Sequence, residues 1–158
     1  MKRLKYTIAN WKMNGSRDSQ KLIKSITKFL EKSRIKKSKI IVCPPFTLLS
    51  QFIKFNKIIS YGGQDCHHLD QGAFTGSISA KMLKDLGCKY VIIGHSERRE
   101  YQKENASEIQ LKIIAALKNN LKVIYCIGEK LSQIKKRNQI LKNQINSLPN
   151  NFNYKDIM

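Results

Sequence analysis

Hydrophobic and polar residues alternate along the chain in blocks that predict buried strands separated by amphipathic helices. Short runs rich in β-branched and aromatic residues, typical of buried strands, occur five times. They lie at residues 5–11, 39–42, 58–61, 90–93 and 122–127. Between these runs, apolar residues recur at helical spacing while lysines fill the opposite helix face. We therefore predict a chain in which strands and helices strictly alternate.

Capping residues predict where the helices begin. The residues suited to N-caps are Ser16 or Asp18, Thr47, Ser79 and Asn105. Glu108 completes a capping box with Asn105, and Gly87 ends the helix that begins at Ser79. The second helix extends to about Phe55, and a last helix covers residues 131–148. The expected buried faces are Leu22, Ile23, Ile26, Phe29 and Leu30 in the first helix, Ile109, Ile113, Ile114 and Leu117 in the helix from Asn105, and Ile134, Leu141 and Ile145 in the last.

Strict alternation implies parallel strands joined by right-handed crossovers. The expected fold class is therefore α/β, either an open doubly wound sheet or part of a barrel. The first strand is followed by Asn-Trp-Lys-Met-Asn-Gly rather than by the Gly-x-Gly-x-x-Gly turn of a dinucleotide-binding sheet. A P-loop pattern is also absent from the sequence. Residues 154–158 resemble the approach to a sixth strand.

The charge raises nucleic acid as a partner. The 158 residues carry a formal net charge of +19, and 41% are hydrophobic, as expected of a globular chain. Most basic residues are lysines spread over every predicted helix, and the dense clusters at residues 34–39 and 135–137 contain no aromatic side chains. We therefore expect no nucleic-acid partner, although a non-enzymatic chain that binds polyanions by charge is an alternative function.

Other function classes are excluded by simple patterns. No apolar run reaches the 18 residues that suggest a membrane span, and the first residues do not resemble a signal peptide, so we expect a cytoplasmic protein without a membrane partner. Neither C-x-x-C pairs nor zinc-finger spacing occurs, so we expect reduced thiols and no metal site. The four cysteines are Cys43, Cys66, Cys88 and Cys126.

Polar residues follow four of the predicted strands directly, and the carboxyl ends of parallel strands meet at one face. Asn10 and Lys12 follow the first strand, and His95 follows the fourth. An amide, an ammonium and an imidazole together suit a small oxyanionic substrate, because they can stabilise a carbonyl oxygen that becomes an enolate. The other polar residues at these strand ends are Gln64, Asp65, Ser96, Glu97, Cys126 and Glu129.

Four ordered motifs resemble those of the triosephosphate isomerase family. Asn-Trp-Lys-Met-Asn at residues 10–14 and Ile-Gly-His-Ser-Glu-Arg-Arg at residues 93–99 are similar to its two signature segments. Gly-Ala-Phe-Thr-Gly at residues 72–76 resembles the tip of its dimer loop, and Tyr-Cys-Ile-Gly-Glu at residues 125–129 its fifth-strand motif. The resemblance is collinear from Tyr6 to about Glu129.

The resemblance implies a (β/α)₈ TIM barrel that interconverts dihydroxyacetone phosphate and glyceraldehyde 3-phosphate in glycolysis and gluconeogenesis, as a homodimer without metal or cofactor. It implies that Lys12 binds the phosphorylated triose, that Asn10 lines the site and that His95 polarises the carbonyl. The family is itself the known case of a catalytic histidine kept neutral by a helix N-terminus, here expected at residues 96–101. Glu97 is expected to be a catalytic partner that either orients Lys12 and His95 or handles a proton, and Thr75 to reach the neighbouring subunit's site.

Two departures from the family pattern stand out. The position after Gly76 is usually acidic in the family and pairs with an arginine at the position of Arg98, but here it is Ser77. In addition, the family chain is nearly 250 residues long, so residues 1–158 are expected to form one incomplete barrel domain of five βα units and the start of strand six. The segment Ala-Tyr-Glu-Pro-Val-Trp, which carries the family's catalytic base, does not occur. A short gene product, a split gene or an incomplete record would each explain this, and we expect the 158 residues alone to be inactive.

Overall fold

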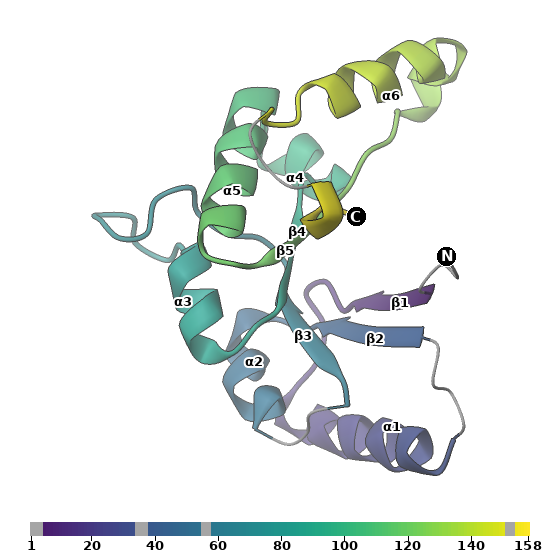
Figure 1. Ribbon diagram of the computed structural model, residues 1–158, viewed down its shortest axis with the longest axis vertical. Helices are drawn as coiled ribbons and strands as arrows, with labels where there is room; N and C mark the ends of the chain where they lie inside the picture. The colour runs from purple at the N-terminus through teal and green to yellow at the C-terminus, as the bar shows by residue number, and fades with distance from the viewer. Residues whose placement is uncertain (1–4, 34–37, 55–57, 151–153) are drawn as a thin grey trace.

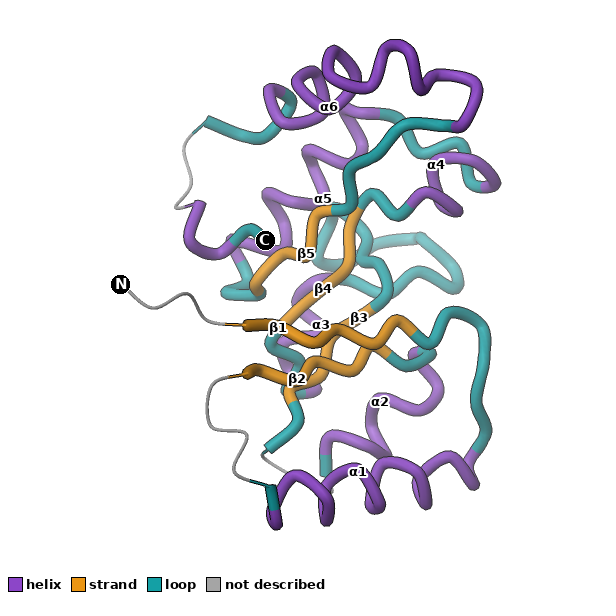
Figure 2. The backbone as a smooth tube through the Cα atoms, turned by 90° about the vertical axis from the view of Figure 1, so that its right-hand side faces the viewer, coloured by secondary structure: helices purple, strands orange, loops and turns teal. Residues whose placement is uncertain are grey.

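The computed structural model describes residues 5–33, 38–54, 58–150 and 154–158. A five-stranded parallel sheet of order β1-β2-β3-β4-β5 runs through it, which confirms the parallel strands and the five βα units expected from the sequence. The strands are β1 (Lys5–Asn10), β2 (Ser38–Cys43), β3 (Ser60–Gly63), β4 (Tyr90–Ile93) and β5 (Lys122–Tyr125). The sheet curls like half of a barrel, and β1 and β5 form its two sides (Figure 2).

Helices cover the convex face of the sheet and leave its concave face open (Figure 1). The α-helices are α1 (Gln20–Lys32), α2 (Phe46–Ile53), α3 (Ala80–Leu86), α4 (Ser96–Tyr101), α5 (Ala106–Lys118) and α6 (Arg137–Asn146). Short 3₁₀ turns occupy η1 (Arg17–Ser19), η2 (Leu131–Lys136) and η3 (Tyr154–Asp156). In the described part of the chain, no helix has the length and apolar character needed to cross a membrane.

The core has one layer on each face of the sheet because side chains alternate along a strand. On the convex face, Val42, Val91 and Val123 pack with helix residues such as Phe52 and Ile113. A smaller cluster lies on the concave face and contains Ile41, Cys43, Tyr90 and Ile92. β4 is buried along its whole length, so it is the strand whose position is most constrained by packing.

Several predicted helix boundaries are confirmed by the capping contacts. The hydroxyl of Ser79 accepts a hydrogen bond from the Met82 amide, and Gly87 ends α3 in the left-handed conformation with φ of 104°. Asn105 and Glu108 form the expected reciprocal capping box at the start of α5. β4 has its predicted bounds, and so does the short helix α4.

Other boundaries were predicted wrongly. Pro45, not Thr47, occupies the N-cap position of α2, and residue 55 lies outside the described residues. β3 begins at Ser60 and includes Gly62 and Gly63, which the sequence pattern placed after it. A Cβ on Gly62 would approach the Tyr90 carbonyl oxygen to 2.9 Å, so these glycines bring β3 close to its neighbours rather than ending it.

The predicted buried faces of two helices were only partly right. In α1, Ile23 is buried and Ile26 and Leu30 are partly buried, but Leu22 and Phe29 are exposed. The segment at residues 131–148 begins as the 3₁₀ turn η2, and no residue of η2 or α6 is buried. Its pattern therefore did not mark a core-facing helix: Leu141 is half-buried, and the side chains of Ile134 and Ile145 are exposed.

The expected approach to a sixth strand is present only in its last two residues. Residues 154–156 form the turn η3, and Ile157 then makes a parallel bridge with Val123 of β5. The Met158 amide donates to the Val123 carbonyl oxygen at 2.9 Å, and the Tyr125 amide donates to Met158 at 2.8 Å. Pairing beyond β5 therefore begins here in the parallel register.

Candidate active site

The turn after β1 holds Lys12 in an unusual backbone conformation. Its φ is 54°, in the left-handed region that residues other than glycine rarely adopt. The side-chain oxygen of Asn10 accepts a hydrogen bond from the Lys12 amide at 3.0 Å. Gln64, which follows β3, donates through Nε2 to the carbonyl oxygens of Lys12 at 2.9 Å and Cys43 at 2.8 Å. Side chains from two strand ends therefore stabilise this turn.

His95 is delivered to the same end of the sheet by the buried strand β4. Gly94 turns the chain with φ of 73°, and His95 then forms the N-cap of α4. Its Nδ1 accepts a hydrogen bond from the Glu97 amide at 3.3 Å. An imidazole that accepts at Nδ1 carries its proton on Nε2, so the ring is assigned as the neutral tautomer with Nε2 free to donate.

The carboxylate of Glu97 brings Lys12 and His95 together. Lys12 Nζ lies 2.8 Å from Glu97 Oε1, and His95 Nδ1 lies 3.4 Å from Glu97 Oε2. The second contact is a close approach rather than a hydrogen bond of the neutral ring, since Nδ1 already accepts the amide hydrogen. The hydrogen bond from Lys12 holds the pKa of Glu97 below its ordinary value. The strand-end residues Asn10, Lys12, His95 and Glu97 thus form one constellation.

Beneath α4 lies a buried charge cluster, here called the quartet, that consists of Asp65, Arg98, Glu104 and Lys112. Lys112 Nζ lies 2.9 Å from Asp65 Oδ2 and also bonds Glu104 Oε1. Arg98 lies 2.9 Å from the same Asp65 oxygen and bonds the same Glu104 oxygen. Arg98 therefore has two carboxylate partners within the chain, although position 77 is a serine. The sequence pattern did not reveal this network, because Asp65 lies 47 residues from Lys112 along the chain.

The two carboxyls of the quartet respond differently to burial. Burial raises the pKa of Asp65, and the attraction of Lys112 offsets this only in part. Burial also opposes ionisation of Glu104, but the hydrogen bonds from Lys112 and Arg98 outweigh it and lower the pKa of that group. The quartet joins the end of β3 to α4 and α5, and so it supports the helix that His95 caps.

Arg99 ties the ends of β4 and β5 together. Its Nε donates to the Gly94 carbonyl oxygen at 2.7 Å, and one terminal nitrogen donates to the Cys126 carbonyl oxygen at 3.0 Å. Burial raises the pKa of the Cys126 thiol, which disfavours the nucleophilic thiolate. A cavity of about 320 Å³ opens beside His95 and is lined by Arg99, Cys126 and Glu129, among other residues. Glu129 is bonded to Arg137 at 2.6 Å.

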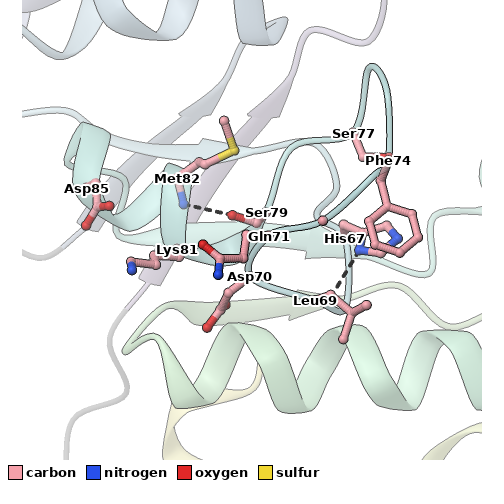
Figure 3. A pocket seen from close by; sticks show the side chains of 11 residues that line it. His67, Leu69, Asp70, Gln71, Phe74, Ser77, Ser79, Lys81, Met82 and Asp85 are labelled. Atoms are coloured by element: carbon pink, nitrogen blue, oxygen red, sulfur yellow. Dashed lines mark hydrogen bonds between the residues drawn. The ribbon is translucent and has the colours of Figure 1, made fainter.

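Thr75 lies apart from this constellation. It is exposed on the loop between β3 and α3, which projects from the body of the molecule (Figure 1). The loop has internal order: the rings of His67 and Phe74 lie 4.2 Å apart, side by side in Figure 3. The Ser77 amide donates to the Phe74 carbonyl oxygen, and the His67 amide to Ile78. Within the described chain, Thr75 makes no contact with Lys12 or His95.

The described residues contain no group of three or more histidine, cysteine or acidic side chains placed to hold a metal ion. What the constellation offers is an ammonium, an imidazole donor and an amide at one end of a parallel sheet. Such groups can bind an anion and stabilise negative charge that develops on a carbonyl oxygen.

Comparisons with known proteins all point to one family. The family model described as triosephosphate isomerase matches residues 5–158. The chain is 44% identical over 150 residues to the triosephosphate isomerase of Wolbachia pipientis wMel, covering 93% of this chain and 60% of that one. It is 48% identical over 124 residues to that of the Wolbachia of Brugia malayi, covering 78% and 51%.

A solved structure agrees with these relatives. The crystal structure of triosephosphate isomerase from Bartonella henselae superimposes with a TM-score of 0.91 at 36% sequence identity. The match covers 98% of this chain and 65% of that one. The chain therefore spans about half to two thirds of the length of the relatives it matches, and its sheet corresponds to part of their TIM barrel.

Proposed function

This chain belongs to the triosephosphate isomerase family, and we propose from that membership that the protein carrying it interconverts dihydroxyacetone phosphate and D-glyceraldehyde 3-phosphate. The reaction moves a proton between neighbouring carbons through an enediolate and is a step of glycolysis and gluconeogenesis. The observation that supports this best is the meeting of Lys12 and His95 at the carboxylate of Glu97.

Lys12 is assigned to bind the anionic substrate. Its ammonium stands at the carboxyl end of β1, where the strained turn and the hydrogen bond from Gln64 fix the backbone. The ion pair with Glu97 positions this ammonium, and both side chains are about half exposed, so substrate oxygens can reach it. The side chain of Asn10 is already bonded to the Lys12 amide and lines the same turn.

His95 is assigned as the electrophile. With Nδ1 accepting the Glu97 amide hydrogen, Nε2 carries the proton that can bond the substrate carbonyl oxygen. As the carbon-bound proton leaves, negative charge grows on that oxygen, and a fixed donor stabilises the enediolate more than the ground state. His95 also caps α4, so the Glu97 amide at the start of that helix holds the ring in place.

Removing the carbon-bound proton needs a base that these residues supply poorly. Glu97 and Glu129 are bonded to Lys12 and Arg137, and those hydrogen bonds lower the pKa of each carboxyl. A carboxylate with a lowered pKa is a weaker general base. We therefore propose that residues 1–158 hold the electrophilic part of the site, and that the polypeptide 1–158 alone lacks turnover. We also propose that these residues form a single domain.

The proposal is tested by a coupled isomerase assay of the full protein that carries this chain, compared with two of its variants. His95→Gln removes the electrophile, and loss of such a donor lowers kcat by about 10² to 10³-fold. Lys12→Met removes a charged hydrogen bond to substrate worth roughly 1.5–3 kcal/mol, so we expect kcat/KM about 10 to 100-fold lower. Lys28→Met, on the exposed face of α1, is the matched control. Normal turnover in both site variants would overturn the proposal.

A homodimer is proposed from the loop that carries Thr75. The loop is exposed, projects from the body and keeps its shape through its own contacts, as a docking element should. We propose that Thr75 reaches the neighbouring subunit's site. We also propose a cytoplasmic location, which the four free thiols support because such a compartment is reducing.

A further inference from the structure

Four lysines from different elements surround one cavity at the amino-terminal end of the sheet. The cavity measures about 470 Å³, within the range of small-molecule sites. Lys39 and Lys122 lie at the starts of β2 and β5, Lys89 directly precedes β4, and Lys84 lies in the last turn of α3. Because the strands are parallel, these starts share one end of the sheet, opposite the end that carries His95.

Most of the positive charge at this cavity is uncompensated. Lys122 pairs with the carboxylate of Asp156 at 2.8 Å. Lys84 donates to the neutral carbonyl oxygen of Asn120 at 2.9 Å and keeps its charge. Lys39 and Lys89 form no ion pair with any described residue. Four ammonium groups and one carboxylate leave a net charge of +3 around the cavity.

The cavity also offers neutral donors and a fixed ammonium. Ser38 and Ser60, the first residues of β2 and β3, are among the residues that line it. The bond from Lys84 to the Asn120 carbonyl oxygen holds that ammonium in place, which reduces the entropy lost when an anion binds. Lysines act on phosphate as point charges, so this arrangement suits a ligand of high charge more than a planar carboxylate.

We propose that this cavity binds a diphosphate group, either as free pyrophosphate or as part of a nucleotide. A diphosphate matches the net positive charge and brings enough acceptor oxygens to engage ammonium and hydroxyl donors together. The cavity is separate from the proposed isomerase site, since the six residue steps from Lys89 to His95 correspond to about 20 Å of extended chain. Its failure would leave the isomerase proposal untouched.

The test is calorimetric titration of the protein with inorganic pyrophosphate at low salt. The variant Lys39→Gln/Lys89→Gln removes two exposed charges from the cavity and should bind at least tenfold more weakly. The control Lys28→Gln/Lys142→Gln removes the same charge from exposed faces of α1 and α6 and should bind like the parent protein. Because the attraction is electrostatic, the parent's affinity should fall as salt is raised.

A Lys12→Met variant separates this cavity from the triose site, and it should bind pyrophosphate normally. ADP distinguishes the two sources of the diphosphate. If ADP binds as tightly as pyrophosphate, the ligand is the diphosphate of a nucleotide. If ADP binds more weakly, the ligand is free pyrophosphate. Equal binding by Lys39→Gln/Lys89→Gln and its control would overturn the site, as would loss of binding in Lys12→Met or no heat of binding in the parent protein.

Discussion

Replacing Lys112 by methionine should destabilise the protein strongly, because this ammonium neutralises two buried carboxylates. The side chain of Lys112 is only 9% exposed, and that of Glu104 only 4%. Glu104 Oε2 has no hydrogen-bond partner among the described residues, so Oε1 receives both Lys112 and Arg98. Methionine fills a similar volume, so the change isolates the charge from the packing.

The expected loss follows from the contacts that remain. Removing one partner of a buried ion pair costs about 3–5 kcal/mol, because it leaves an uncompensated charge. Arg98 still bonds both Asp65 and Glu104, which places the expected loss near the lower limit, about 3 kcal/mol. For a chain of this size, that loss lowers Tm by roughly 6–12 °C.

The pH dependence gives a sharper test than the loss itself. Lys112 stabilises the charged forms of Asp65 and Glu104, so without it the pKa of each carboxyl rises. A carboxyl with a raised pKa in the folded state binds more protons folded than unfolded, so acid favours folding there. The parent protein, by contrast, loses the contribution of Glu104 as the pH falls below the ordinary range of a glutamate, because the pKa of that group is lowered. The stability difference between parent and variant should therefore shrink as the pH falls from 7 towards 4.

The assay is urea unfolding followed by circular dichroism at several pH values. Lys28→Met, on the exposed face of α1, is the control and should change the free energy of unfolding by less than about 0.5 kcal/mol. A loss under about 1 kcal/mol for Lys112→Met would contradict the buried-pair argument. If the stability difference between the parent protein and Lys112→Met grew as the pH falls, that would contradict the assignment of Asp65 and Glu104 as charged groups that Lys112 stabilises.

Three further outcomes follow from the site and the loop. Gln64→Ala removes the bonds to the Lys12 and Cys43 carbonyl oxygens, each worth about 0.5–1.5 kcal/mol, so kcat/KM should fall about 3 to 10-fold. The control Gln51→Ala removes the bonds to Gln20 and to the Arg17 carbonyl oxygen and should leave kcat/KM unchanged; equal kinetics for both variants would refute the role of Gln64. Thr75→Arg in the protein should yield monomers of low activity by sedimentation and turnover assays, and unchanged values of both would show that the loop does not dock. The polypeptide 1–158, expressed alone, should be poorly soluble. It should also show no isomerase turnover above background, since general-base catalysis contributes about 10² to 10⁴-fold to the rate. Supplying the remaining third of the family's chain in trans or in frame should restore both solubility and activity, and robust turnover by the fragment alone would mean that Glu97 or Glu129 acts as the base.

Parallel strands were predictable because strands and helices alternate strictly along the chain, and strands such as β2 and β4 carry a run of apolar residues bounded by proline or glycine. β4 is the clearest case: four apolar residues precede Gly94, and all four are buried. The helix caps at Ser79 and Asn105 were predictable for a similar reason, since their hydrogen bonds are local in sequence. Local chemistry decides such features before tertiary packing acts.

The errors occur where packing between distant segments decides the structure. Leu22 and Phe29 fit a helical stripe but are exposed, because α1 lies beside α2 at one edge of the molecule and buries only Ile23 fully (Figure 2). Glycine usually weakens a strand, so the sequence pattern predicts that β3 ends before Gly62. Here the glycines of β3 allow this strand to approach Tyr90 and Leu83 closely, which no pattern within β3 reveals.

The site shows the same division between local and distant information. Asn10, Lys12, His95 and Glu97 were predictable as a group because each lies at the carboxyl end of a strand or shortly after it, and parallel strands bring their carboxyl ends together. The role of Gln64 was not predictable, because its partners are carbonyl oxygens of other strand ends. Every residue type carries a backbone carbonyl oxygen, so such acceptors leave no pattern in the sequence. The sequence alone therefore does not show whether an amide side chain at a strand end contacts the substrate or stabilises the backbone.

The change at Ser77 shows why a missing charge in one motif does not predict a missing interaction. Arg98 needs a carboxylate partner, because an unpaired guanidinium on a partly buried helix would lose hydration without compensation. Asp65 supplies that carboxylate from the end of β3, where it also bonds Lys112, so the quartet balances two positive with two negative charges. An acidic residue at position 77 would add a negative charge beside a cluster that is already neutral, since Ser77, Asp65 and Arg98 line one cavity. We therefore expect positions 65 and 77 to be coupled. Asp65→Asn alone should leave Arg98 and Lys112 with Glu104 as their one remaining carboxylate within the quartet, whereas Asp65→Asn with Ser77→Glu should recover part of the lost stability. Equal unfolding free energies for the single and double variants would show that the two positions are independent.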